Sequence, residues 1–204
     1  MCDNSHEGIS LKKAAFTMLE LVFVIVVAGI LAAALIPRMD RDTLYEASEQ
    51  LLRDIKYTQH MAMMDNVYDD SDQYWYEKRW RITFDDTDDQ YAISKGVTTD
   101  GNYARDPLSR NQINGMAGNN DYDLDHKYSI SLALESSTSG GAAGTYDKLA
   151  FDQLGRPYVF STDEQASATA SALQSNYVIT LSDGDESAKI TVRPETGYSD
   201  ITYN

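Results

Sequence analysis

The sequence predicts an α+β protein in which a long N-terminal helix packs against an antiparallel β domain. Three observations predict this fold class. A largely apolar run extends from Phe16 to Ile36, and apolar residues then recur every three or four positions to about Asp65. Short segments that alternate apolar and polar residues follow to the C-terminus. Each kind of element has one apolar face, so a helix followed by strands buries those faces against each other.

The composition limits the classes of protein to which the chain can belong. Its 204 residues are enough for one soluble domain with an appendage, and the formal net charge is −15. An acidic surface repels phosphate backbones, so we expect no nucleic acid partner. Because Cys2 is the only cysteine, no internal disulfide can form, and the domain must rely on its core, on metal or on assembly.

The apolar run is long enough to cross a bilayer. As a helix, residues 16–36 extend over about 31 Å, and the hydrocarbon core is about 30 Å thick. Lys12 and Lys13 precede the run and are expected to stay cytoplasmic, which places the rest of the chain on the other side. Glu20 interrupts it, and a carboxylate in a membrane helix costs about 3 kcal/mol, so Glu20 is expected to have a function and a partner.

Two ordinary interpretations of this run explain less of it. A cleaved secretory signal has an apolar region of about 7–15 residues with small residues after it. Here the run is longer, and the small residues Ala14 and Ala15 come before it. A plain signal anchor fits the length but gives no reason for Glu20.

The start of the run resembles the N-terminus of type IV pilin-like proteins. The residues A-F-T-M-L-E at positions 15–20 are similar to the (G/A)-F-T-x-x-E motif at which a prepilin peptidase cuts in that family. The resemblance implies a leader of residues 1–15, cleavage between Ala15 and Phe16, and N-methylation of Phe16. Glu20 matches the acidic residue fifth after the cut. Ala15 departs from the glycine that usually precedes the cut.

Cleavage would give Glu20 its partner. It creates an α-amino group on Phe16, and among parallel helices Glu20 of one subunit can pair with that amine in a neighbour. In a low dielectric the attraction is strong, but it offsets the desolvation of both charges only when the geometry is favourable. We therefore expect the pair to set the register of assembly.

The helix is expected to continue past Pro37 as an amphipathic segment, residues 37–66. In this family the helix normally continues past such a proline. Residues that recur at helical spacing predict its buried stripe: Leu44, Ala47, Leu51, Ile55, Thr58 and Ala62. Met61, Met63 and Met64 are expected to fill the core beside this stripe.

Residues 67–204 are expected to form the extracytoplasmic antiparallel domain, with about six to eight short strands. Strands are predicted near residues 80–84, 91–96, 128–134, 149–151, 158–160, 177–181 and 189–192. The Asp183-Gly184 pair predicts a hairpin between the last two. Loops are predicted at 68–76, 96–127 and 136–145, and residues 161–175 are expected to form a flexible loop or a weak helix.

Two C-terminal stretches narrow the resemblance. L-A-F-D-Q-L-G-R-P at 149–157 and I-T-V-R-P-E-T-G at 190–197 are similar to the GspH/FimT group of minor pseudopilins and minor pilins. The resemblance implies a structural subunit of a type II secretion pseudopilus or a type IV pilus, held by one membrane span in the bacterial inner membrane. The implied partners are other pilin or pseudopilin subunits, the prepilin peptidase, the inner-membrane assembly platform and membrane lipid.

Two alternatives of other kinds remain open. One is a minor pilin with adhesive or ligand-binding loops, above all residues 96–127. The other is a membrane-anchored domain that never polymerises. An enzyme is not expected, because the sequence has no G-x-S-x-G, H-E-x-x-H or phosphate-binding loop motif and offers His6, His60 and His126 without a recognisable catalytic pattern.

No cofactor is expected, with calcium as the one candidate. Asp121, Asp123 and Asp125 resemble the start of an oxygen-ligand loop, but the glycine and the distal glutamate of an EF-hand do not follow them. The acidic run at 85–89 is a second place where carboxylates gather. Solvated acidic loops are the competing interpretation of both.

Overall fold

The computed structural model describes residues 17–72, 74–96, 102–135, 148–160 and 171–204, and the side chains of all of these except 33–42, 160 and 171. The chain divides into two compact units, residues 1–39 and 40–204. The predicted leader, with Ala15 and the cut site before Phe16, lies outside the described residues.

Helix α1 extends over Met18–Met64 and includes Pro37. It begins directly after Thr17, whose Oγ1 accepts a hydrogen bond from the backbone N–H of Glu20 at 3.3 Å. A threonine in that place satisfies one of the N–H groups that the first turn leaves unpaired. The helix that the sequence predicts up to about Asp65 is confirmed in type and in its C-terminal bound.

The buried stripe of α1 is confirmed within the second unit. Leu44, Ala47, Leu51, Ile55, Thr58 and Ala62 are all at most 3% exposed. The prediction for the methionines is wrong in two of three places. Met61 packs against the core, whereas Met63 and Met64 are 53% and 75% exposed, because they lie on the side of the helix away from the stripe.

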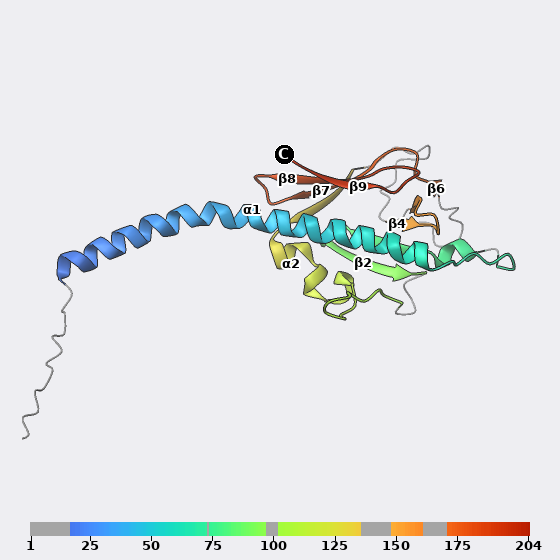
Figure 1. The fold of residues 1–204 in the computed structure, drawn as a ribbon, viewed down its shortest axis with the longest axis horizontal. Coiled ribbons are helices and arrows are strands. Elements are labelled where there is room, and N and C mark those ends of the chain that lie inside the picture. Colours follow the sequence, from blue (N-terminus) through green and yellow to red (C-terminus); the bar gives the residue numbers. More distant parts are fainter. Residues whose placement is uncertain (1–16, 73, 97–101, 136–147, 161–170) are drawn as a thin grey trace, which may run out of the picture. The chain divides into compact units, whose positions relative to one another are not determined.

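The strands form two antiparallel sheets rather than one. The five-stranded sheet has the order β2 (Gln90–Lys95), β1 (Trp80–Asp85), β4 (Lys148–Phe151), β5 (Pro157–Phe160), β6 (Ser171–Ala172). The four-stranded sheet has the order β3 (Ser131–Glu135), β7 (Tyr177–Ser182), β8 (Ser187–Val192), β9 (Ser199–Tyr203). The α+β class is thus confirmed. In Figure 1 the cyan part of α1 runs between β7–β9 and β2. Residues of α1 and of both sheets share one core cluster.

The strands near residues 80 and 91 and the hairpin around Asp183-Gly184 are confirmed. β1 pairs with β2 from Trp80–Lys95 to Asp85–Gln90, and β7 pairs with β8 from Tyr177–Val192 to Ser182–Ser187. Apolar and polar residues alternate clearly in these segments, and the turns between them are short, so the local sequence pattern was enough to identify them.

The strand predicted at 128–134 begins later than expected. Tyr128 ends helix α2 (Leu124–Tyr128), and β3 starts at Ser131. Asp123 starts α2, because its carboxylate accepts a hydrogen bond from the backbone N–H of His126 at 2.8 Å. Ser129 ends it in a left-handed conformation, with φ 56°. Strand β9 and the 3-10 turns η1 (Trp75–Lys78), η3 (Gly115–Ala117) and η4 (Asn120–Tyr122) were not predicted.

Candidate functional site

The first described part of α1 is a helix with apolar side chains exposed in every direction. Its large apolar residues between Met18 and Leu31 range from 88% exposed at Met18 to 37% at Val27. An isolated apolar surface of this kind is stable only when lipid or protein covers it. Glu20, the predicted assembly residue, lies in the first turn of this segment and is exposed.

Among the residues that the structure describes, no helix combines the length and the apolar character that crossing a membrane requires. The predicted span of 16–36 begins at Phe16, outside the described residues. Its spanning of a membrane stays a prediction.

A buried polar network lies on the second part of α1. Gln50, Asp54 and Thr58 follow one another every four residues, so they share one side of the helix. Tyr91 of β2 is fully buried, and its hydroxyl donates to Asp54 Oδ2 at 2.8 Å. The same hydroxyl accepts from Gln50 Nε2 at 2.9 Å. Thr58 Oγ1 donates to the backbone carbonyl of Asp54 at 2.8 Å.

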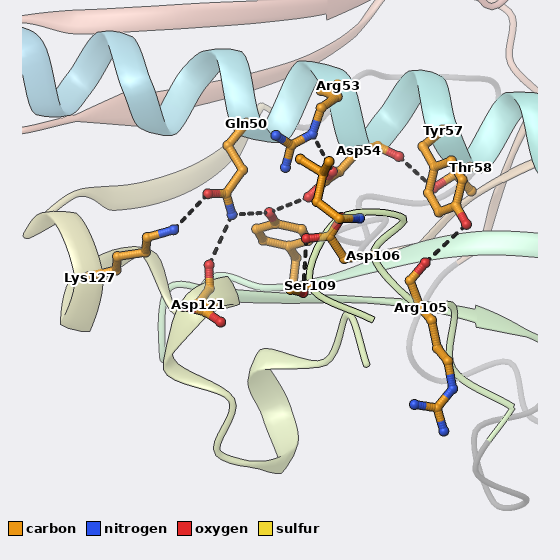
Figure 2. A network of polar contacts seen from close by, with 12 residues as sticks. Gln50, Arg53, Asp54, Tyr57, Thr58, Arg105, Asp106, Ser109, Asp121 and Lys127 are labelled. Carbon is orange, nitrogen blue, oxygen red and sulfur yellow. Dashed lines mark hydrogen bonds and ion pairs between the residues drawn. The ribbon is translucent and has the colours of Figure 1, made fainter. Parts of the chain in front are cut away.

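Gln50 connects α1 to three other elements. Besides Tyr91, its Nε2 donates to the backbone carbonyl of Asp121 at 2.9 Å. Its Oε1 accepts from Lys127 Nζ and from the Tyr128 hydroxyl, each at 2.9 Å. Figure 2 shows Lys127 of α2 and Asp121 of η4 converging on Gln50. The side-chain amide therefore uses both donors and both acceptor positions, which fixes its orientation.

Burial governs the protonation of this network. Desolvation raises the pKa of the Asp54 carboxyl, although hydrogen bonds from Tyr91 and Arg53 act in the opposite direction. Burial and the charge of Asp54 raise the pKa of the Tyr91 hydroxyl well above its usual value. Tyr91 thus remains a proton donor to Asp54, and the pair functions as a hydrogen bond rather than as an acid and a base.

The segment after residue 101, expected to be an open loop, is bound to β2 and α1. It pairs with β2 through the bridges Ser94–Tyr103 and Ala92–Asn114 and so covers the edge of that strand. Tyr57 of α1 donates to the backbone carbonyl of Arg105 at 3.0 Å. Ala104, Ile113 and Leu124 are buried. The ligand-binding alternative gains no support from this segment, because its apolar side chains belong to the core.

An open hollow of about 890 Å³ lies between α1 and this segment, and we call it the α1 hollow. Glu46, Glu49 and Arg53 line it from the helix. Asp106, Asp121 and Lys127 are among the residues that line it from the other side. Four carboxylates against two cations make the hollow suited to a positively charged group.

The predicted calcium residues lie near one another in sequence but have separate roles. The backbone carbonyl of Asp121 accepts from Gln50, and the carboxylate of Asp123 caps α2. In the part of the chain that the structure describes, no three acidic, histidine or cysteine side chains gather to hold a metal. The calcium site at Asp121, Asp123 and Asp125 stays a prediction.

Sequence reasoning missed the network around Gln50 and Asp54. A signal was present, because two polar residues at a spacing of four lie beside a stripe of apolar residues. Their partners are not visible in the sequence. Tyr91 is 41 residues from Gln50, and Tyr128 is 78 residues from it.

The comparisons with known proteins found no match to any family model, to any curated protein or to any solved structure.

Proposed function

We propose that the chain is a structural subunit of a type IV pilin-like filament, either a type II secretion pseudopilus or a type IV pilus. The observation that carries the proposal is the nature of α1. Its first part exposes apolar side chains on all sides, while its second part forms the core of an α+β domain. A helix of this kind can anchor a domain in lipid and later pack among the helices of identical or related subunits.

The proposal includes the steps that such a subunit undergoes. The chain is inserted in the bacterial inner membrane with Lys12 and Lys13 on the cytoplasmic side, and the domain after residue 66 is periplasmic. A prepilin peptidase removes residues 1–15, and Phe16 is methylated. The proposal assigns no catalytic residue and no cofactor to the chain.

Glu20 has a defined place in this proposal. Thr17 caps the start of α1 through the backbone N–H of Glu20, so the carboxylate belongs to the first turn of the helix. A carboxylate there is within one turn of the amine that cleavage would create at Phe16. The two charges pair between neighbouring subunits and set how far one subunit is displaced along the next.

Mass spectrometry of the N-terminus of the membrane-extracted chain is the direct test. We expect a methylated Phe16 as the first residue. An intact N-terminus from Met1 to Ala15 in cells with an active prepilin peptidase would overturn the proposal.

A second experiment tests the role of Glu20. Glu20→Ala should leave the amount of the chain in the membrane unchanged but remove it from isolated filaments. Asp185→Ala, in the exposed turn between β7 and β8, is the matched loss of a carboxylate and should assemble normally. Normal entry of the Glu20→Ala variant into filaments would exclude the pairing.

A further inference from the structure

The hairpin at residues 102–114 presents polar side chains on its outer side. Its backbone is fixed, because the N–H of Ile113 donates to the carbonyl of Ala104 at 2.9 Å and the carbonyl of Ile113 accepts from β2 at 3.0 Å. Ala104 and Ile113 are buried, whereas Arg105 and Gln112, which pair with each other across the hairpin, are exposed. Figure 2 shows the Arg105 guanidinium pointing away from α1. The support for a ligand that the apolar side chains of this segment do not give comes from its polar ones.

An open hollow of about 530 Å³ lies on this outer side, and we call it the amide hollow. Among the described residues that line it, Arg105 carries the only charge, and most of the others carry side-chain amides. The amides belong to Asn111, Gln112, Asn114 and Asn119. An amide both donates and accepts hydrogen bonds, so the hollow suits a ligand whose groups also do both.

Asn114 has a buried polar atom that the chain does not satisfy. The residue lines the amide hollow and is 3% exposed, and its Oδ1 has no hydrogen-bond partner among the described residues. A buried acceptor without a donor destabilises a fold, so such atoms are normally paired with water or with a ligand. The atom needs an O–H or N–H group, which a sulfate or a carboxylate at neutral pH does not offer.

A second open hollow, of about 770 Å³, adjoins the first, since Arg105 and Gln112 line both. We call it the aromatic hollow, because its lining includes Tyr74, Trp80 and Tyr103. Tyr74 is 49% exposed, so its ring is accessible. An aromatic ring offers a broad apolar face, against which the C–H groups of a sugar ring pack well.

Charges in the aromatic hollow are balanced, although the chain has a net charge of −15. Its two lysines form ion pairs with aspartates, Lys78 with Asp72 at 2.6 Å and Lys95 with Asp65 at 2.7 Å. The remaining charges of its lining, on Glu77 and Arg105, are of opposite sign. Unlike the α1 hollow, this surface therefore favours neither a cation nor an anion.

We propose that the amide hollow and the aromatic hollow together bind a neutral oligosaccharide. Each hydroxyl group of a sugar both donates and accepts, so it can satisfy the amides, the Arg105 donors and the unpaired Asn114 oxygen. The aromatic rings then contact the next sugar unit. The inference does not depend on the proposed function, because both hollows lie within the second unit of the chain and need no membrane, cleavage or assembly.

A peptide is the competing ligand, since its backbone also donates and accepts. Peptides are usually held by an open strand edge or by apolar pockets for their side chains. Here the hairpin already covers the edge of β2, and the apolar side chains of the hairpin are in the core. These two observations favour the oligosaccharide.

Saturation-transfer NMR on the full chain tests the proposal, in a detergent without a sugar head group. The probes are maltotriose, mannotriose and triacetylchitotriose, each at about 10 mM. We expect saturation to pass from the protein to at least one of them, and neither sodium sulfate nor triglycine to displace it. If none of the three binds, the hollows hold water only and the proposal is overturned. Displacement by sulfate or by triglycine would overturn it in favour of an anion or a peptide.

Two variants locate the binding. The side chains of Asn111 and Gln112 are exposed and make no hydrogen bond within the described residues, so their loss should not disturb the fold. Asn111→Ala and Gln112→Ala should each raise the Kd of the bound saccharide by about fivefold. Asn120→Ala is the matched control, because Asn120 is exposed in the same segment but does not line either hollow. Equal Kd values for all three variants would place the ligand elsewhere and refute the proposal.

Asn114→Ala tests the buried oxygen separately. We expect the saccharide to raise the Tm of the wild type but not that of the variant, because the variant lacks the acceptor that the ligand satisfies. Without saccharide the variant should melt no lower than the wild type, since it loses only an unpaired acceptor. A variant that binds the saccharide as tightly as the wild type would show that this oxygen is not part of the site.

Discussion

The Tyr91 hydroxyl offers the most direct measure of how strongly the domain is held to α1. Tyr91→Phe removes one oxygen and leaves the ring against Tyr122, with centroids 5.7 Å apart. It deletes the hydrogen bond to the Asp54 carboxylate at 2.8 Å and the one from Gln50 at 2.9 Å. We expect the variant to fold with the same architecture but with lower stability.

The size of the effect follows from the two bonds. A hydrogen bond to a charged group contributes about 1.5–3 kcal/mol, and a neutral one about 0.5–1.5 kcal/mol. Gln50 keeps its hydrogen bonds to its other three partners, so only part of the stabilisation that Gln50 contributes is lost. We expect the free energy of unfolding to fall by about 2–4 kcal/mol. In a domain of this size each kcal/mol lowers the Tm by about 2–4 °C.

Urea denaturation of the purified full chain in detergent, followed by tryptophan fluorescence, measures the change. Tyr198→Phe is the matched control, because Tyr198 is mostly exposed and its hydroxyl makes no hydrogen bond within the described residues. The control should change the free energy of unfolding by less than about 0.5 kcal/mol. A Tyr91→Phe variant as stable as the control would refute the view that the network holds α1 to β2.

Three further predictions concern the same domain. Asp54→Asn should be less stable than the wild type at low pH and should approach the wild type as pH rises above about 4. Burial raises the pKa of the Asp54 carboxyl, so the protonated carboxyl stabilises the wild-type fold below its ordinary pKa, and this stabilisation is lost as the carboxyl ionises at higher pH. Denaturation of both proteins from pH 3 to 7 measures this, and an equal difference in unfolding free energy at every pH would contradict it. Asp152→Ala should lower the free energy of unfolding, measured by urea denaturation, by about 3 kcal/mol. The buried carboxylate accepts hydrogen bonds from two backbone N–H groups and from Arg156 Nε at 2.8–2.9 Å. An equal loss in Asp185→Ala, where the carboxylate is exposed, would contradict this prediction. Gly197→Ala should lower the Tm more than Gly184→Ala. Both glycines have positive φ, but only at Gly197 would a Cβ lie 2.5 Å from Gln59 Nε2 and from the Gly155 carbonyl oxygen. Equal shifts in Tm would show that the close contact has no effect.

The sequence predicted those parts of the fold that depend on local periodicity. The stripe from Leu44 to Ala62 is readable because a helix returns to the same side every three or four residues. The β7–β8 hairpin is readable because alternation and a tight turn occur together. Tyr128 was misassigned, since its alternation with Ile130 and Leu132 outweighed the cap that Asp123 provides for α2.

The parts that could not be predicted depend on contacts distant in sequence. The sequences of the β segments do not indicate that β3 pairs with β7 rather than with β4. This pairing is what divides the strands into two sheets. The network of Gln50 joins residues from α1, β2, η4 and α2.

The position of α1 between two sheets also determines how the domain responds to mechanical tension. Gln59 Nε2 donates to the carbonyl of Gly155, in the turn after β4, at 2.9 Å and to that of Thr196, in the turn before β9, at 3.1 Å. The helix is thus fastened to both sheets, in addition to its buried stripe. A pull along its axis loads these contacts in shear and all together, rather than one after another as in peeling. A domain built this way transmits force along its helix while its two sheets share the load.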